Sequence, residues 1–180
     1  MARKTQYVVL CEDEVQYSFA RRFLIGRGAH PRRFSARYSP RGRCSGEQWV
    51  RDHFAEEVAA LRRYGGSGRS LVVLIDADTL ERDQRIAELL ERLRQEAMVD
   101  LHASERIGVF VPARNIETWI HHILNPGRAD LDEKEDYSAS RLPDGWRQKV
   151  ENYAKERATK PKTAPDSFRH AARAYERIKP

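Results

Sequence analysis

The sequence predicts an α/β fold, a mostly parallel four-stranded sheet flanked by helices in the order βαβαβαβ, with a C-terminal helical extension. Four short apolar runs alternate with stretches whose apolar residues recur at helical spacing. Parallel neighbouring strands need helical crossovers of this kind, whereas antiparallel strands can be joined by tight turns. The 180 residues are 40% hydrophobic and 33% charged, which is typical of a globular domain.

Apolar spacing places the elements in the first part of the chain. Consecutive apolar residues indicate buried strands, and apolar residues at i, i+3, i+4 or i+7 indicate one buried helix face. The expected elements are a strand over 5–11, a helix with Val15, Phe19 and Phe23 that ends near Gly26 or Gly28, a strand over 31–38, a helix with Val50, Phe54, Val58 and Leu61, a strand over 71–75, a helix with Ile86, Leu89, Leu90 and Leu93, and a strand over 106–111.

The rest of the chain is expected to be helical apart from one loop. A short helix after Pro112 has its apolar side at Ile116, Trp119, Ile120 and Ile123, and two basic amphipathic helices follow later, one from Trp146 and one around Phe168. We therefore expect an α/β domain over residues 1–124, a loop over 125–145, and a basic helical extension over 146–180 packed on the domain.

The composition indicates a cytoplasmic protein. No apolar run approaches the ~20 residues that span a bilayer, and the first residues do not resemble a signal or transit peptide. The two cysteines, Cys11 and Cys44, make neither a disulfide framework nor a zinc-ligand pair. We expect a soluble protein in a reducing compartment, without a membrane partner.

The formal net charge of +6 is unevenly distributed. Residues 15–46 contain eight arginines and no acid, and residues 141–180 contain eleven Lys or Arg against five Asp or Glu. Basic flanks around an acidic middle suit a polyanion held beside a metal bound by carboxylates. The alternative is that these arginines only solvate helix faces.

Acidic residues close two of the predicted strands. The run Leu71–Ile75 leads into Asp76 and Asp78, which point the same way if the chain is extended. Glu12 follows the first strand. If the two strands are parallel neighbours, the three carboxylates lie at the edge where open α/β sheets hold ligands. Oxygen ligands favour Mg²⁺ or Mn²⁺, so we expect Glu12, Asp76 and Asp78 to bind one of these ions.

Helix capping is a purely structural alternative for some of these acids. Asp78 with Glu81 three residues later is typical of a capping box, and residues 12–14 make a favourable acidic first turn. Neither explanation covers Asp76. A buried carboxylate is costly unless it is paired, hydrogen-bonded or bound to a metal.

Further polar residues follow the fourth strand. Glu117 and His121 are four residues apart on one helix face, and Arg114 lies in the preceding loop. Glu117 is a candidate catalytic residue because its strand ends at the same edge. Arg114 could hold a phosphate or pair with Glu117, and His121 could be a general base or simply be solvated.

Three stretches resemble the TOPRIM domain, the metal-binding fold of topoisomerases, primases and nucleases of the overcoming-lysogenization-defect type. They are Val8-Val-Leu-Cys-Glu12, Val72-Val-Leu-Ile-Asp-Ala-Asp78 and Pro112-Ala-Arg-Asn-Ile-Glu-Thr-Trp-Ile120. The third is similar to small bacterial TOPRIM-like proteins of the RloB-like kind, several of them linked to phage defence. The resemblance implies that Glu12 is the general acid/base or a ligand, that Asp76 and Asp78 bind metal, and that Glu117 is a site carboxylate.

The chain departs from this pattern at three positions. Asp13 and Glu81 stand where TOPRIM proteins usually have glycine. Gln16 stands where the nuclease subgroup often has a second acid, which weakens the case for a two-metal site.

The sequence thus predicts Mg²⁺-dependent phosphodiester hydrolysis of nucleic acid, in phage defence or DNA processing, with a separate ATPase partner left open. The chain is too short for the extra domains of a topoisomerase. The arginines expected to contact nucleic acid are Arg21, Arg22, Arg32, Arg33, Arg41, Arg43 and Arg114. The alternatives are a non-catalytic subunit that binds nucleic acid or a partner, and a receiver-like signalling domain, which the lack of a predicted fifth strand disfavours.

Overall fold

The computed structural model describes residues 5–40, 44–64, 68–127, 132–138, 141–156 and 164–179. The elements within these ranges are β1 (Gln6–Leu10), α1 (Glu14–Gly26), β2 (Phe34–Arg37), α2 (Gly46–Arg63), β3 (Arg69–Leu74), α3 (Arg82–Ala97), β4 (Ile107–Phe110), α4 (Ile116–Leu124), α5 (Trp146–Glu156) and α6 (Asp166–Ile178). None of the helices in the described ranges has the length and apolar character needed to cross a membrane. The predicted α/β class is confirmed.

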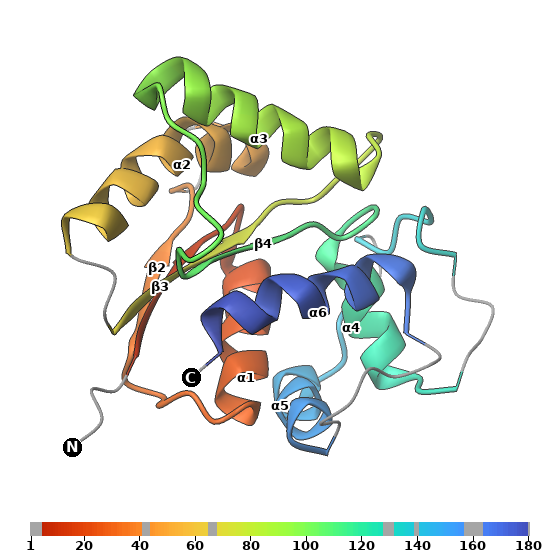
Figure 1. Ribbon diagram of the computed structural model, residues 1–180. Coiled ribbons are helices and arrows are strands. Elements are labelled where there is room, and N and C mark those ends of the chain that lie inside the picture. The colour runs from red at the N-terminus through yellow and green to blue at the C-terminus, as the bar shows by residue number, and fades with distance from the viewer. Residues whose placement is uncertain are drawn as a thin grey trace.

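The strands form one parallel sheet in the order β2-β1-β3-β4 (Figure 1). In the central pair, Val8 of β1 lies opposite Leu71 of β3, and Leu10 lies opposite Val73. Both strands are almost wholly apolar because helices cover both faces of the sheet. The predicted parallel pairing of the first and third strands is therefore confirmed.

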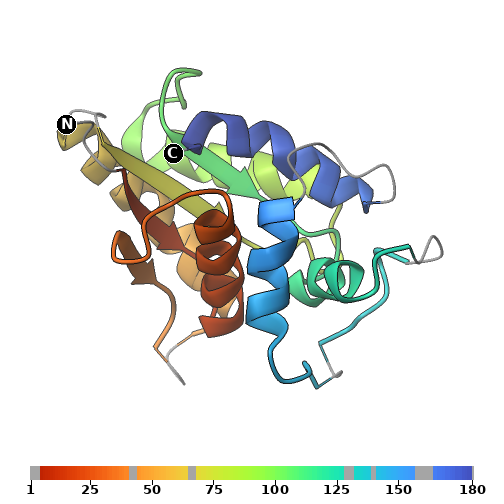
Figure 2. The same ribbon diagram turned by 90° about the horizontal axis from the view of Figure 1, so that it is seen from below.

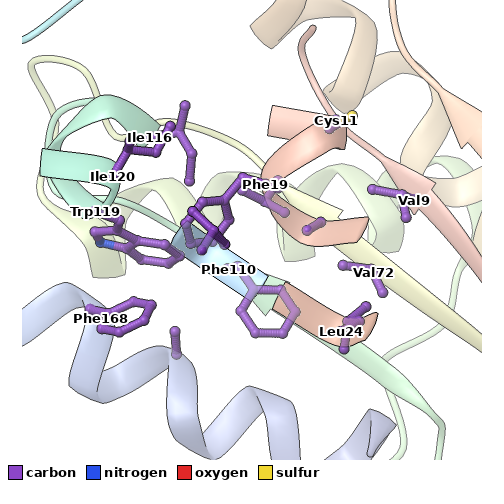
Figure 3. Packing of buried hydrophobic residues seen from close by; sticks show 14 of the residues in the cluster. Val9, Cys11, Phe19, Leu24, Val72, Phe110, Ile116, Trp119, Ile120 and Phe168 are labelled. Atoms are coloured by element: carbon purple, nitrogen blue, oxygen red, sulfur yellow. The ribbon is translucent and has the colours of Figure 1, made fainter. Parts of the chain in front are cut away.

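The helices form two layers around the sheet. Helices α2 and α3 pack on one face, and α1, α4, α5 and α6 cover the other (Figures 1 and 2). Side chains alternate along each strand, so Val8 and Leu10 face the first layer whereas Tyr7 and Val9 face the second. Phe19, Trp119 and Phe168, from three different helices, meet in the second layer (Figure 3).

The C-terminal helices belong to the same core. Trp146, Val150 and Phe168 from α5 and α6 are buried in the cluster that contains β1. The Tyr7 hydroxyl donates a hydrogen bond to the carbonyl oxygen of Ile178 over 3.2 Å. The Arg106 guanidinium donates to the same oxygen over 3.2 Å, which ties the end of α6 to β1 and to the residue before β4.

Helices α1 and α5 are in close contact at Gly26. A Cβ on Gly26 would lie 2.3 Å from the carbonyl oxygen of Glu151 and 2.8 Å from the Cβ of Ala154. These distances are far inside van der Waals contact, so the crossing of the two helices requires a residue without a side chain.

We expect Gly26→Ala to lower the free energy of unfolding by about 1–3 kcal/mol, because the added methyl group overlaps the backbone of α5. Helix propensity alone predicts the opposite, a gain of roughly 1 kcal/mol. Urea denaturation followed by circular dichroism measures the difference. A variant as stable as the wild type would contradict this close packing.

Candidate functional site

The sheet order reverses between β1 and β3, with β2 beside β1 on one side and β4 beside β3 on the other. Such a switch point is the usual ligand site of an open α/β sheet. Glu12 follows β1 and Asp76 follows β3, and the backbone N–H of Asp76 donates to Glu12 Oε1 over 2.6 Å. The structure thus brings these two predicted residues into direct contact.

Glu12 itself does not cap helix α1. The N-cap is Asp13, whose side chain accepts a hydrogen bond from the Gln16 N–H over 2.9 Å. The Gln16 side chain in turn accepts from the Glu12 N–H over 3.0 Å. The helix-capping explanation therefore applies to Asp13 but not to the Glu12 carboxylate, which is bonded to the end of β3.

The predicted capping box of Asp78 with Glu81 is wrong. Helix α3 begins at Arg82 and its N-cap is Glu81, whose N–H donates to the Gln84 side chain over 2.9 Å. The helix therefore starts later than the sequence pattern indicates. Asp78 is left in the connection between β3 and the helix, with no capping role.

Backbone pairing with the loop after β4 explains this late start. The N–H of Ala77 donates to the carbonyl of Pro112 over 3.0 Å, and that of Asp78 donates to the carbonyl of Arg114 over 3.1 Å. Asp78 has a φ of 53°, in the left-handed region that residues other than glycine seldom adopt. Its side chain is about half exposed.

Asp76 is the acid most strongly affected by its surroundings. Its Oδ1 is buried, and no described residue forms a hydrogen bond with it. Burial raises the pKa of Asp76 well above its usual range, and the negative charges of Glu12, Glu117, Asp78 and Asp13 raise it further, in that order. Two ionised carboxylates cannot share such a site without a proton or a cation.

Glu12 is affected in the same direction. Burial raises the pKa of Glu12 to about 7, and the charges of Asp78 and Asp13 add to the effect. The hydrogen bond from the Asp76 N–H and the neighbouring Gln16 side chain offset part of it. Glu12 therefore exchanges its proton near neutral pH, as a general base requires.

Glu117, in the first turn of α4, completes the acidic group. Burial raises its pKa, and the charges of Asp13 and Asp136 contribute. Arg114 does not pair with Glu117: its Nη2 lies 3.7 Å from Asp136 Oδ2. Asn115 also donates to Asp136, over 2.7 Å. Of the two alternatives for Arg114, the pair with Glu117 is not formed, and Arg114 pairs instead with Asp136 in the segment 132–138.

His121 is partly buried rather than solvated. Its ring lies against that of Tyr137, with the centroids 4.6 Å apart. No described residue forms a hydrogen bond with its Nδ1. A role for His121 as general base stays a prediction.

Arg85 in α3 is a site residue that sequence reasoning missed. Its side chain is 4% exposed, and its Nη1 lies 2.5 Å from Glu47 of α2 and 2.8 Å from Glu88. Its Nε donates to the backbone carbonyl of Asp76 over 3.0 Å, and its Nη2 lies 3.7 Å from Asp78 Oδ2. Arg85 thus contacts both ends of the segment from Asp76 to Asp78 and stabilises its position.

Gly46, the first residue of α2, was also missed. A Cβ on Gly46 would lie 2.5 Å from the Cβ of Glu12 and 2.9 Å from its Cα. The N-terminus of α2 therefore rests directly on Glu12, where the helix dipole favours negative charge.

Three predicted nucleic-acid contacts lie away from the acidic group. Arg32 and Arg33 directly precede β2 and so lie at the amino edge of the parallel sheet, opposite the carboxylates. Arg21 donates to the carbonyl of Pro31 over 3.1 Å, in the same region. The structure does not bring these arginines to the acidic edge.

The other predicted arginines are placed differently. Arg22 pairs with Glu151 of α5 at 3.1 Å. Arg114 lies at the carboxyl edge, after β4. Arg41 and Arg43 lie outside the described residues. Contact with nucleic acid stays a prediction for all seven arginines.

The donor set fits Mg²⁺ or Mn²⁺ in its chemistry, because it consists of carboxylates and includes the unpartnered Oδ1 of Asp76. Across the described ranges, no three His, Cys, Asp or Glu side chains are arranged to hold a metal ion. Glu12 Oε1 is engaged by the Asp76 N–H instead. The acids are thus gathered but do not form a closed coordination shell.

None of the family models, curated proteins or solved structures compared with this chain matches it. The resemblance to TOPRIM proteins therefore rests on the three sequence stretches. Those stretches supply Asp76 and three of the four acids whose charges raise its pKa, namely Glu12, Glu117 and Asp78.

We expect the free energy of unfolding, without divalent ions, to fall as the pH rises from about 4.5 to about 7. The folded state keeps the Glu12 proton over this interval while the unfolded state has lost it, so each rise in pH favours unfolding. Asp76→Asn removes a neighbouring charge and is expected to flatten the slope and raise the stability near pH 8 by about 1–3 kcal/mol.

Thermal and urea unfolding across this pH range measure the effect. Asp83→Asn is the matched control, because the Asp83 side chain is 81% exposed. Asp83→Asn is expected to keep the pH profile of the wild type. If Asp76→Asn also kept it, the result would contradict the charge crowding at Asp76.

We expect Arg85→Met to destabilise the fold by about 1–3 kcal/mol, because the Asp76 carbonyl loses its buried donor while Glu47 keeps Arg51 as a partner at 3.3 Å. Arg92→Met on the same helix is the control, since Arg92 is 41% exposed and its ion pairs are at the surface. Its expected cost is about 1 kcal/mol or less. Equal losses for the two variants, measured by urea unfolding, would contradict a special role for Arg85.

Proposed function

We propose that this protein hydrolyses phosphodiester bonds in nucleic acid with Mg²⁺ or Mn²⁺ as cofactor. The observation that carries the proposal is the group of acids at the β1–β3 switch point around the unpartnered Oδ1 of Asp76. A buried cluster of like charges is costly, and a divalent cation is the ligand that offsets it. The resemblance to TOPRIM nucleases supports the same residues in the same roles.

Each acid has a distinct task in this proposal. Asp76 and Asp78 hold the ion, which when bound offers positive charge to the scissile phosphate and acidifies a water molecule. Glu12, with a pKa of about 7, accepts a proton from the attacking water. Glu117 adds negative charge beside Asp76 and so strengthens cation binding.

The phosphate contact in this proposal falls to Arg114. It is the one arginine among the described members of the predicted set that lies at the carboxyl edge, and its partner Asp136 is exposed. A phosphate oxygen competes with that carboxylate for the guanidinium. The overall charge of +6 favours a polyanionic substrate, and phage defence or DNA processing is the setting that the resemblance implies.

A non-catalytic subunit that binds nucleic acid or an ATPase partner is the second candidate. It is favoured by the absence, among the described residues, of three donors arranged around a metal. Gln16, where the nuclease subgroup often has an acid, is buried and bonded to the Glu12 N–H. A receiver-like domain is disfavoured, since no fifth strand follows β4 in the described ranges.

Cleavage of plasmid DNA, single-stranded DNA and RNA in Mg²⁺ or Mn²⁺ tests the proposal. We expect Glu12→Gln and Asp76→Asn each to lower the cleavage rate by about 100-fold or more, because each removes a group that acts on the reacting water or the ion. Asp83→Asn, purified in the same way, is expected to keep the wild-type rate.

Equal cleavage by Asp76→Asn and the wild type would contradict the proposal. If no variant cuts any substrate while wild type and Asp76→Asn both bind nucleic acid with a steep salt dependence, the second candidate replaces it.

A further inference from the structure

We propose that the protein binds a small anionic amphiphile, an apolar molecule with one carboxylate or sulfonate end, between helices α1, α5 and α6. A cavity of about 620 Å³ lies there. These helices cover the face of the sheet opposite α2 and α3 (Figure 2). Its volume is in the range of small-molecule sites. None of the four site acids lines it, so this inference does not rest on the proposed hydrolysis.

Apolar side chains of the sheet and of the helices that cover this face line the cavity. Val72 and Leu74 of β3 form its floor, and aromatic side chains form its walls: Phe19, Phe23, Phe110, Trp119, Tyr153, Phe168 and Tyr175. In Figure 3, Trp119 and Phe168 lie on one side of Phe110 and Leu24 lies on the other. An aliphatic or aromatic body is therefore the matching chemistry for the interior.

The cavity is half open to solvent and far larger than the voids of a packed core. Interiors are packed as densely as organic crystals, and their voids are seldom larger than a water molecule. Apolar cavities of about 150 Å³ already stay dry and take up apolar molecules. This cavity is several times larger, so an apolar occupant would restore the dispersion contacts that its walls lack.

The mouth of the cavity carries positive charge. The exposed residues that line it are Arg169, Arg173 and Glu176, all on α6. Arg169 pairs with Asp166, and Glu176 pairs with Lys179 at 3.0 Å.

Arg173 is the group at the mouth that is available to an anion. It forms no ion pair with any residue in the described ranges. Across the opening, Arg27 of α1 also lines the cavity, with its guanidinium over the Tyr175 ring at 5.2 Å. Two cations around an apolar interior select a ligand with an anionic end.

A displacement assay with the fluorescent probe anilinonaphthalenesulfonate tests the inference. The competing ligands are decanoate and its neutral counterpart decanol, both at concentrations below micelle formation. We expect decanoate to bind about fivefold more tightly than decanol, and Arg173→Gln to abolish this preference. Arg177→Gln, a matched loss of charge on the same helix outside the cavity lining, is expected to keep it.

A second pair of variants tests the location. Ala172 lines the cavity, and Ala172→Phe is expected to weaken both ligands about tenfold or more by occupying their space. Ala87→Phe, at an exposed position of α3, is the control. Circular dichroism checks that each variant folds, and the arginine pair still decides the matter if Ala172→Phe does not.

The inference would be overturned if decanoate did not bind, or if decanoate and decanol bound with equal affinity. It would also be overturned if Arg177→Gln lost the preference for decanoate as fully as Arg173→Gln. So would a dimer in light scattering that Ala172→Phe dissociates, because a second copy of the chain would then be the occupant. Asp76→Asn is expected to bind decanoate like the wild type, which separates this result from the outcome of the cleavage assay.

Discussion

The pairing of β1 with β3 is the contact on which the candidate site and both cores depend. With Leu10 opposite Val73, the chain beyond each strand brings Glu12 to the backbone N–H of Asp76. A slip of one residue would exchange the two faces of β1 and turn Val8 and Leu10 away from α2. The hydrophobic pattern that fixes the register therefore also fixes the distance between the acids.

The surroundings of Asp76 are asymmetric. Arg85 stabilises the backbone side of this segment, since its guanidinium bonds to the Asp76 carbonyl and lies near Asp78. No described group compensates the carboxylate in the same way, because Asp76 Oδ1 is buried without a hydrogen bond. The fold thus places the positive charge of Arg85 beside the backbone of this segment and leaves the Asp76 carboxylate without a compensating group. Such an arrangement lowers stability, and under the proposed function cation binding offsets that cost.

The parts of this structure that follow from burial were predictable from the sequence. Continuous apolar runs predicted the strands, helical spacing predicted the covering helices, and the acids after Leu10 and Ile75 predicted the gathering of Glu12 and Asp76. These inferences succeed because each depends on one segment and on the rule that parallel strands end together.

The parts that depend on contacts between distant segments were not predictable. Helix α3 starts at Arg82 because Ala77 pairs with Pro112, a residue far along the chain. Arg85 shares the i, i+4, i+8 spacing of the buried Leu89 and Leu93, but the sequence does not show the partners from other segments, Glu47 and the Asp76 carbonyl, that make its burial tolerable. Charge counting likewise identified Arg32 as a candidate contact but could not say at which edge of the sheet it lies.

The bond from the Tyr7 hydroxyl to the Ile178 carbonyl has a consequence for synthesis on the ribosome. Tyr7 emerges well before α6, so the part of the sheet face around Phe110 lacks α6 until Ile178 has been made and released. Uncovered apolar surface on a nascent chain is what chaperones bind and what aggregates when they are scarce. The yield of folded protein should therefore depend on how quickly α6 is released and docks.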